Sequence, residues 1–387
     1  MEYIIYTILG YLTVSVIYNT IFSIASVFKT RQTPTIEHEK ENRIAAFIPA
    51  YKEDGIIFQT AKNALNQDYN PNQYDVIVIA DSLQKSTMEK LGTLPIKVME
   101  VAFAKSTKAK AINRTYEAID TEYDITVVLD ADNEMASDFL TKVNREYNAG
   151  YRAIQGHRVA KNRENSLSIL DTISEEINNN IYRKGHQNLG LSSALIGSGM
   201  AFDFLLFRKE MSQIDAIGGF DKALELSLLK SNIAIKYMED GLVYDEKVSQ
   251  ADVFTNQRTR WIAAQIRYGM NSFVDAGIEL FKNGNINYFD KSLQFLLPPR
   301  LILLGVLLLT AFGSLLVSYE AAAYVFTLFS VYSLSLIVAT PRALFNRESL
   351  KACLLLPKTF VLMLIAIAGF KKAKNNFLHT PHQTVQS

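Results

Sequence analysis

Three long apolar runs lie at the two ends of a more mixed sequence: Tyr3 to Phe28, Phe295 to Val317 and Ala321 to Thr340. Each has about the 20 residues that a helix needs to cross the hydrocarbon core of a membrane. We therefore predict three transmembrane helices. The first is interpreted as an uncleaved anchor, because no positive charge precedes it and its apolar run is too long for a signal peptide.

Basic residues follow the first and third apolar runs, namely Lys29, Arg31, Lys40 and Arg43, and then Arg342, Arg347 and Lys351. Because cytoplasmic flanks of membrane helices are enriched in Lys and Arg, this pattern places both flanks in the cytoplasm. A fourth apolar run, Leu354 to Phe370, is interrupted by Pro357 and Lys358 and followed by a lysine cluster. It favours a helix lying in the cytoplasmic interface over a fourth span.

Between the membrane runs, strand-like and helix-like patterns alternate after a polar linker. Strand formers fill Ile44 to Pro49, Tyr74 to Ala80, Ile96 to Val101 and Ile125 to Leu129, and helical periodicity covers Gly55 to Gln67 and Lys108 to Ala118. This alternation predicts an α/β domain with a doubly wound, mostly parallel sheet. In such sheets, ligands bind beyond the carboxyl ends of the strands. Asp81, Asp130 and Asp132 follow strands at that edge.

Composition narrows the possible functions. The 387 residues include 40 Lys and Arg and 39 Asp and Glu, so the overall charge does not favour nucleic-acid binding. The single cysteine, Cys353, cannot form an intramolecular disulfide, which suits a reducing compartment.

Asp130 and Asp132 flank a single residue where a buried strand is expected to end. Hard divalent cations such as Mg²⁺ or Mn²⁺ take oxygen ligands and share them between carboxylates and substrate phosphates. The pair therefore indicates a metal that bridges to a diphosphate. The alternative is a solvated acidic loop.

Short motifs along the chain resemble, in their order, those of family 2 glycosyltransferases: Phe47 to Glu53, Val78 to Asp81, Lys108 to Asn113, Asp130 to Asp132, Gln155 to Arg158, Gly197 to Phe202, Gly218 to Asp221 and Gln257 to Trp261. The resemblance covers Ile44 to about His382. It implies a GT-A-like fold and a metal-dependent enzyme that takes a sugar from a nucleotide-sugar donor.

The resemblance also implies roles for individual residues. Those expected to bind the donor are Pro49, Tyr51, Glu53, Asp81, Lys110, Asp130, Asp132, Gln257, Arg258 and Arg260. Asp132 and Asp130 are expected to hold the metal, and Trp261 and Gly199 to contact the acceptor. The tail with His379 and His382 resembles a segment that closes over the donor nucleotide.

The sequence departs from the family at the general base. Inverting transfer needs a carboxylate to take the proton of the acceptor hydroxyl, yet Ala223 occupies the position where the family carries an Asp. Glu225 is slightly preferred over Asp221 as the replacement, with Glu239 and Asp240 as further candidates. Glu225 could instead be the polar face of a helix, and Asp221 its cap.

We therefore expect a membrane anchor over residues 1–29, a cytoplasmic glycosyltransferase domain over 30–292, two transmembrane helices over 293–342, and an interfacial helix with a cytoplasmic tail over 343–387. The expected activity is inverting transfer from a UDP-linked sugar to a membrane-associated glycan or lipid, with synthase or export partners if a channel is needed. The alternatives are a polyprenyl-phosphate sugar transferase and a non-catalytic, nucleotide-binding subunit of a membrane glycan synthase.

Overall fold

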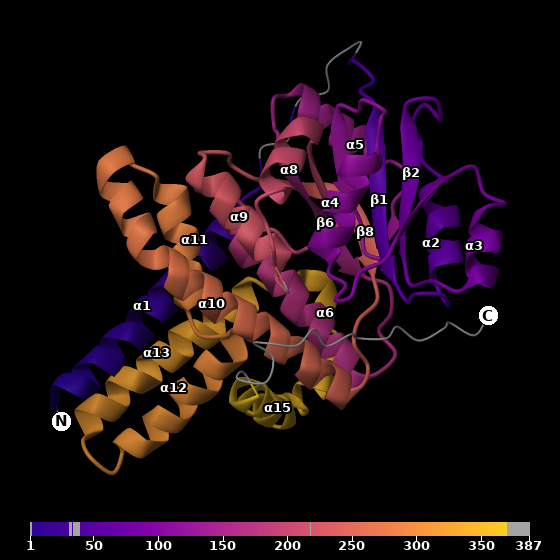
Figure 1. The fold of residues 1–387 in the computed structure, drawn as a ribbon. Helices are drawn as coiled ribbons and strands as arrows, with labels where there is room; N and C mark the ends of the chain where they lie inside the picture. Colours follow the sequence, from indigo (N-terminus) through magenta and orange to yellow (C-terminus); the bar gives the residue numbers. More distant parts are fainter. Residues whose placement is uncertain (1, 31–32, 34–38, 217, 370–387) are drawn as a thin grey trace.

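A twisted sheet with helices on both faces lies beside a group of apolar helices in the computed structural model, which describes residues 2–30, 33, 39–216 and 218–369 (Figure 1). The strands run in the order β3-β2-β1-β4-β7-β6-β8-β5. Their bounds are Ile44–Tyr51 (β1), Tyr74–Asp81 (β2), Lys97–Val101 (β3), Ile125–Val128 (β4), Glu134–Met135 (β5), Ala153–Ala160 (β6), Met200–Asp203 (β7) and Lys236–Asp245 (β8). The α/β architecture predicted from the sequence is confirmed.

Strands β3, β2, β1 and β4 pair in parallel, as the sequence predicted. Strand β7 runs antiparallel to both β4 and β6, and this reversal was not foreseen. Because side chains alternate between the faces of a strand, β1 supplies Phe47 to one core and Ile48 to the other. Burial on both faces explains why the parallel strands are continuous apolar runs.

The helices of the α/β domain cover both sheet faces. They are α2 (Ile57–Ala64), α3 (Lys85–Leu91), α4 (Lys108–Ala118), α5 (Phe139–Asn148), α6 (Ser166–Asn179), the π-helix η1 (Asn180–Gly185), α7 (His186–Asn188), α8 (Phe204–Met211) and α9 (Phe220–Lys230). Helices α4, α8 and α9 share a core with Phe47, whereas α2 and α5 pack with Ile48. Helix α6 continues through η1 and α7 toward the apolar helices.

The remaining helices are α1 (Glu2–Ser26), α10 (Ala251–Asn283), α11 (Ile286–Leu296), α12 (Arg300–Ser314), α13 (Tyr319–Val338), the short η2 (Arg342–Leu344), α14 (Arg347–Cys353) and α15 (Leu356–Ala368). Within the described residues, Tyr6–Ser26 and Tyr319–Val338 are individually long and apolar enough to cross a membrane. These match the first and third predicted spans. Figure 1 shows α1, α12 and α13 projecting together from the sheet domain.

The second predicted span is not one straight helix. Helices α11 and α12 are bent by 58° on either side of Leu297, Pro298 and Pro299. Proline cannot donate a backbone hydrogen bond and disfavours helical geometry in the residue before it. With 15 residues, α12 extends only about 22 Å, less than the roughly 30 Å of a bilayer core.

The fourth apolar run is also broken, because α14 and α15 are bent by 52°. Helix α15 has 13 residues, about 20 Å of helix, and buries Thr359, Met363 and Ala366. Its place in the membrane interface stays a prediction. The lysine cluster after it, His379, His382 and the expected closure over the donor lie outside the described residues.

Helix α1 packs closely against the π-helix η1. A Cβ added to Gly185 would lie 2.2 Å from the backbone oxygen of Phe22. The Phe22 ring stacks on His186 at 3.6 Å, and the Tyr18 hydroxyl donates to Asp290 at 2.9 Å. The close approach fixes α1 against η1 of the α/β domain, and the polar contact joins α1 to α11.

Gly185→Ala should therefore destabilise the protein by about 1–3 kcal/mol, because the added methyl group must push the α1 backbone away. Thermal unfolding in detergent would measure the effect. Gly10→Ala is the matched control on α1, where an added Cβ meets nothing within 4 Å. Equal melting temperatures for the two variants would contradict the close packing.

Candidate active site

The predicted donor residues at the start of the domain meet at the carboxyl ends of β1 and β2. Tyr51 and Asp81 are register partners, and the Lys52 N–H donates to the Asp81 carbonyl at 3.1 Å. Lys52 and Ser82 adopt left-handed φ values of 57° and 60°. Such backbone conformations cost about 1–3 kcal/mol each and concentrate at functional sites. This strand edge is therefore held in a strained shape.

Pro49 also lies in β1, and Glu53 directly follows the strand, so both belong to the same edge. Asp81 is 2% exposed and accepts a hydrogen bond from the Ser82 hydroxyl at 3.0 Å. The fold thus brings together the residues expected to hold the nucleotide base. Their contact with a base stays a prediction.

The Asn133 side chain contacts the backbone of Asp130 and the carboxylate of Asp132 in the Asp-Ala-Asp motif after β4. Its Oδ1 accepts from the Asp130 N–H at 3.1 Å, and its Nδ2 donates to Asp132 at 3.3 Å and to Asp245 at 3.0 Å. Lys108 Nζ lies 2.5 Å from an Asp130 oxygen. The motif is therefore a preorganised carboxylate pair beside a fixed positive charge, rather than a solvated loop.

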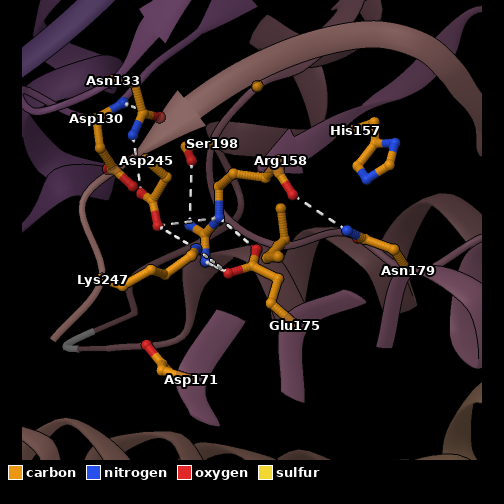
Figure 2. A network of polar contacts seen from close by, with 12 residues as sticks. Asp130, Asn133, His157, Arg158, Asp171, Glu175, Asn179, Ser198, Asp245 and Lys247 are labelled. Carbon is orange, nitrogen blue, oxygen red and sulfur yellow. Dashed lines mark hydrogen bonds and ion pairs between the residues drawn. The ribbon is translucent and has the colours of Figure 1, made fainter. Parts of the chain in front are cut away.

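Behind this motif lies a buried network of charged side chains (Figure 2). Arg158 Nε donates to Glu175 at 2.7 Å, and Lys247 Nζ contacts Glu175 and donates to Asp245 at 2.7 Å. Asp245 in turn accepts from Asn133. Sequence analysis missed this network, because its members are spread over β6, α6 and the end of β8.

The network shifts the ionisation of its members in the directions that keep them charged. Burial alone would raise the pKa of Glu175, but Arg158 and Lys247 hold it well below its usual range. Burial alone would lower the pKa of Arg158, but Asp245 and Glu175 raise it. Arg158, Lys247, Glu175 and Asp245 are thus four buried groups, two of each charge, that lie behind the Asp-Ala-Asp motif.

A cavity of about 1360 Å³ is lined by Asp130 of this motif together with Lys108 and Asp221, whereas Asp132 lies outside the lining. The start of α10 contributes Arg258, Arg260 and Trp261 to its wall. Lys108 lines the cavity, whereas Lys110, which was predicted to bind the donor, does not. Likewise Gly197 lines it, whereas the predicted Gly199 packs against Val243.

The Arg258 guanidinium pairs with Asp171 and lies 4.3 Å from the centre of the Trp261 ring. Trp261 is 38% exposed, which leaves part of its ring open to the cavity. Burial lowers the pKa of Arg260. Gln257 lies outside the lining, and within the described residues its buried Oε1 has no hydrogen-bond partner.

The two candidate bases differ in accessibility. Glu225 is 1% exposed, lies 3.0 Å from Lys291 Nζ and accepts from the Leu195 N–H at 3.2 Å. Burial raises its pKa, although Lys291 opposes the shift. Glu225 also lines the cavity, but Lys291 already pairs with its carboxylate, so this geometry does not favour the sequence-based preference for Glu225.

Asp221 is the second residue of α9, and its carboxylate faces Gly197 across the cavity wall. Lys222 Nζ lies 4.0 Å away. The further candidates Glu239 and Asp240 pair with Lys184 and Arg145 and lie outside the cavity lining. Asp221 is therefore the better placed of the candidate bases.

Glu175→Gln should lower the free energy of unfolding by about 3–5 kcal/mol, because it leaves Arg158 and Lys247 with one buried carboxylate between them. Urea unfolding would measure this loss. Glu176→Gln is the control, since this neighbour contacts His157 at 3.1 Å outside the network. A Glu175 variant as stable as the control would contradict the assigned role.

This chain has relatives among curated proteins. The chain is 26% identical over 237 residues to beta-monoglucosyldiacylglycerol synthases from Nostoc sp. and Trichormus variabilis, a match covering 56% of this chain and 48% of each relative. The chain thus spans about half the length of these curated relatives.

Among solved structures, the chain is similar to the mannosyltransferase PcManGT from Pyrobaculum calidifontis, solved with GDP-Man and Mn²⁺. The TM-score is 0.55 at 15% identity, covering 94% of this chain and 100% of that one. This likeness confirms the GT-A-like fold. The family described as "Glycosyltransferase like family 2" matches residues 42–264, more than half of the chain. This chain therefore belongs to glycosyltransferase family 2.

Proposed function

We propose that this glycosyltransferase moves a sugar, with inversion, from a UDP-linked donor to a membrane-associated glycan or lipid in polysaccharide or cell-envelope glycan synthesis. One observation supports this most strongly. A single cavity is lined at one end by Lys108, Asp130 and Asp221 and at the other by Leu336 of α13 and Met363 of α15. A sugar donor and a membrane-borne acceptor could meet inside it.

The donor end suits a divalent metal shared with a diphosphate. Asp130 and Asp132 would hold Mg²⁺ or Mn²⁺, and no cluster of three potential protein ligands occurs among the described residues. Mg²⁺ commonly binds in this way, through one or two carboxylates with substrate phosphates and water. The bound ion would offset the charge that develops on the leaving diphosphate. Arg258 and Arg260 would add fixed positive charge.

Asp221 would act as the general base. Its carboxylate takes the proton of the acceptor hydroxyl while that oxygen bonds to C1 of the sugar. The bond between C1 and the diphosphate oxygen breaks on the opposite side, and the nucleoside diphosphate leaves. A single displacement of this kind inverts the configuration at C1. The Trp261 ring offers an apolar face to a sugar.

The proposed membrane location rests on the composition of the helices and on similarity to the curated relatives. Among the described residues, two helices are individually apolar and long enough to span, and the curated relatives are named beta-monoglucosyldiacylglycerol synthases. We place the enzyme in the cytoplasmic membrane as a multi-pass protein, with residues 30–292 in the cytoplasm, two membrane helices over 293–342 and an interfacial helix and tail over 343–387. The uridine preference rests on Asp81 at the end of β2.

Asp132→Ala should reduce transfer by roughly a hundredfold or more, because a metal contributes several kcal/mol of charge stabilisation. Transfer of labelled sugar to membrane lipids with Mn²⁺ would be measured. Asp138→Ala is the control, since this exposed carboxylate pairs with Lys142. Full activity in excess chelator would contradict the proposal. Nucleotide binding without any transfer by the wild type would identify a non-catalytic subunit.

Asp221→Asn should slow turnover by about a hundred- to ten-thousand-fold while nucleotide binding persists, because only the basic oxygen is lost. Glu225→Gln is the comparison and should affect stability more than turnover, since it breaks the buried pair with Lys291. Steady-state rates and nucleotide titrations of both variants provide the test. The reverse pattern would move the base to Glu225. If neither Asp221→Asn nor Glu225→Gln slowed turnover, the acceptor would be one that needs no general base.

A further inference from the structure

One wall of the cavity is formed by a loop between α7 and β7. Residues 191–199 form neither helix nor strand, and 194–197 line the cavity. Gly197 in this loop has a left-handed φ of 92°, a conformation that favours glycine. Because the loop makes no helix or strand hydrogen bonds of its own, other groups must satisfy its buried backbone.

Gly197 lies next to the proposed base and to the lysine that pairs with the metal motif. Its carbonyl accepts from Lys108 Nζ at 2.9 Å, and the same ammonium lies 2.5 Å from an Asp130 oxygen. A Cβ added to Gly197 would lie 3.8 Å from the Asp221 carboxylate. A shift of the loop would therefore change the surroundings of Asp130 and of Asp221.

The amide of Gln155 holds the backbone of this loop on both sides of Gly197. Its Oε1 accepts from the Ile196 N–H at 3.0 Å, and its Nε2 donates to the carbonyl oxygens of Ser198 at 3.0 Å and Gly199 at 3.2 Å. The amide oxygen thus meets an N–H, and the amide nitrogen meets carbonyl oxygens. Turning the amide over would lose these bonds, so the contact needs both of its ends.

Gln155 holds the loop without reaching the cavity. It is fully buried on β6, pairs in register with Met200 of β7 and lies outside the cavity lining. A side chain in this position does not touch the donor or the acceptor. Because it is buried, water cannot replace the hydrogen bonds that its loss would leave unmade. An effect of Gln155 on sugar transfer must therefore pass through the loop.

We propose that Gln155 is a positioning residue for sugar transfer. Its amide fixes residues 196–199, and the fixed loop keeps Gly197 beside Asp221 and keeps its carbonyl on Lys108. This inference rests on the proposed function and adds to it a residue that acts away from the reacting atoms. A displacement of about 1 Å can slow an enzyme by about a hundredfold. Loss of the amide should therefore lower kcat more than it weakens nucleotide binding.

The first test replaces the amide with an apolar side chain of similar length. In the full-length protein in detergent, Gln155→Met should lower kcat about ten- to a hundredfold while UDP still binds with Mn²⁺. Gln187→Met is the matched control. Gln187 accepts from the Tyr237 N–H at 2.7 Å and donates to the Tyr237 carbonyl at 3.1 Å, outside the cavity lining. Equal kcat values for the two Met variants would overturn the positioning role.

A second variant displaces the loop without touching Gln155. Gly197→Ala places a methyl group beside Asp221 at a φ that residues with a Cβ rarely adopt, so it should also lower kcat. Gly190→Ala is its control, because Gly190 has a φ of 77° and an added Cβ meets nothing within 4 Å. Both variants strain the backbone, but only Gly197→Ala should lose turnover. Equal kcat values for the two Ala variants would contradict the role of the loop.

The double variant tests whether both changes act through the same loop. Gln155→Met combined with Gly197→Ala should lower kcat by less than the product of the two single effects, because coupled sites are not additive. A loss equal to that product would contradict a shared loop. A wild type that transfers no sugar would contradict the proposed function and this inference with it. A Gln155→Met variant as active as a wild type that does transfer sugar would contradict the positioning role alone.

Discussion

The buried pairing of Arg158 with Glu175 is the contact on which the arrangement of the site depends. Arg158 lies on β6, and Glu175 lies on α6. Because charges removed from water must be compensated, the contact fixes where α6 can lie against the sheet. Lys247 and Asp245 extend the same compensation to Asn133, which contacts both aspartates of the metal motif. Figure 2 shows Glu175 of α6 connected through Lys247 and Asp245 to Asn133.

Helix α6 also connects the buried charged network to α10 and α12. Glu175 points into the network, while the adjacent Ser174 accepts from Arg300 at the start of α12. Asp171, one turn earlier, pairs with Arg258 of α10. One helix thus connects the metal motif, the positive charges of α10 and the first turn of a membrane-side helix. A replacement of the ion pair by apolar residues need not unfold such a protein, but it would remove this alignment.

The sequence predicted those elements that local chemistry determines. The continuous apolar strands identified β1, β2 and β4, and Thr107 caps α4 at the residue where its periodicity begins. The break at Pro298 and Pro299 was not predicted, because the length of the apolar run suggested one span. The antiparallel β7 and the buried network could not be predicted, because they depend on contacts such as Glu175 with Lys247, 72 residues apart.

In the candidate site, too, some residues could be identified from local sequence, whereas others could be identified only from the fold. Asp130 and Asp132 were found because they follow a buried strand. Lys108 and Lys110 lie about 200° apart around a helix, and only the fold shows which one faces Asp130. Asp221 and Glu225 lie on the same side of a helix, so periodicity could not separate them, whereas burial against Lys291 does.

The central claim is that sugar transfer by inversion ends on a membrane lipid that reaches the metal motif through one cavity. The most direct measurement is identification of the product formed by the wild-type enzyme in liposomes from a labelled UDP-sugar and Mn²⁺. Mass spectrometry would identify the acceptor, and NMR would identify the anomeric configuration of the new bond. We expect the label on a lipid, with the configuration opposite to that of the donor. A water-soluble product, or retained configuration, would contradict the claim.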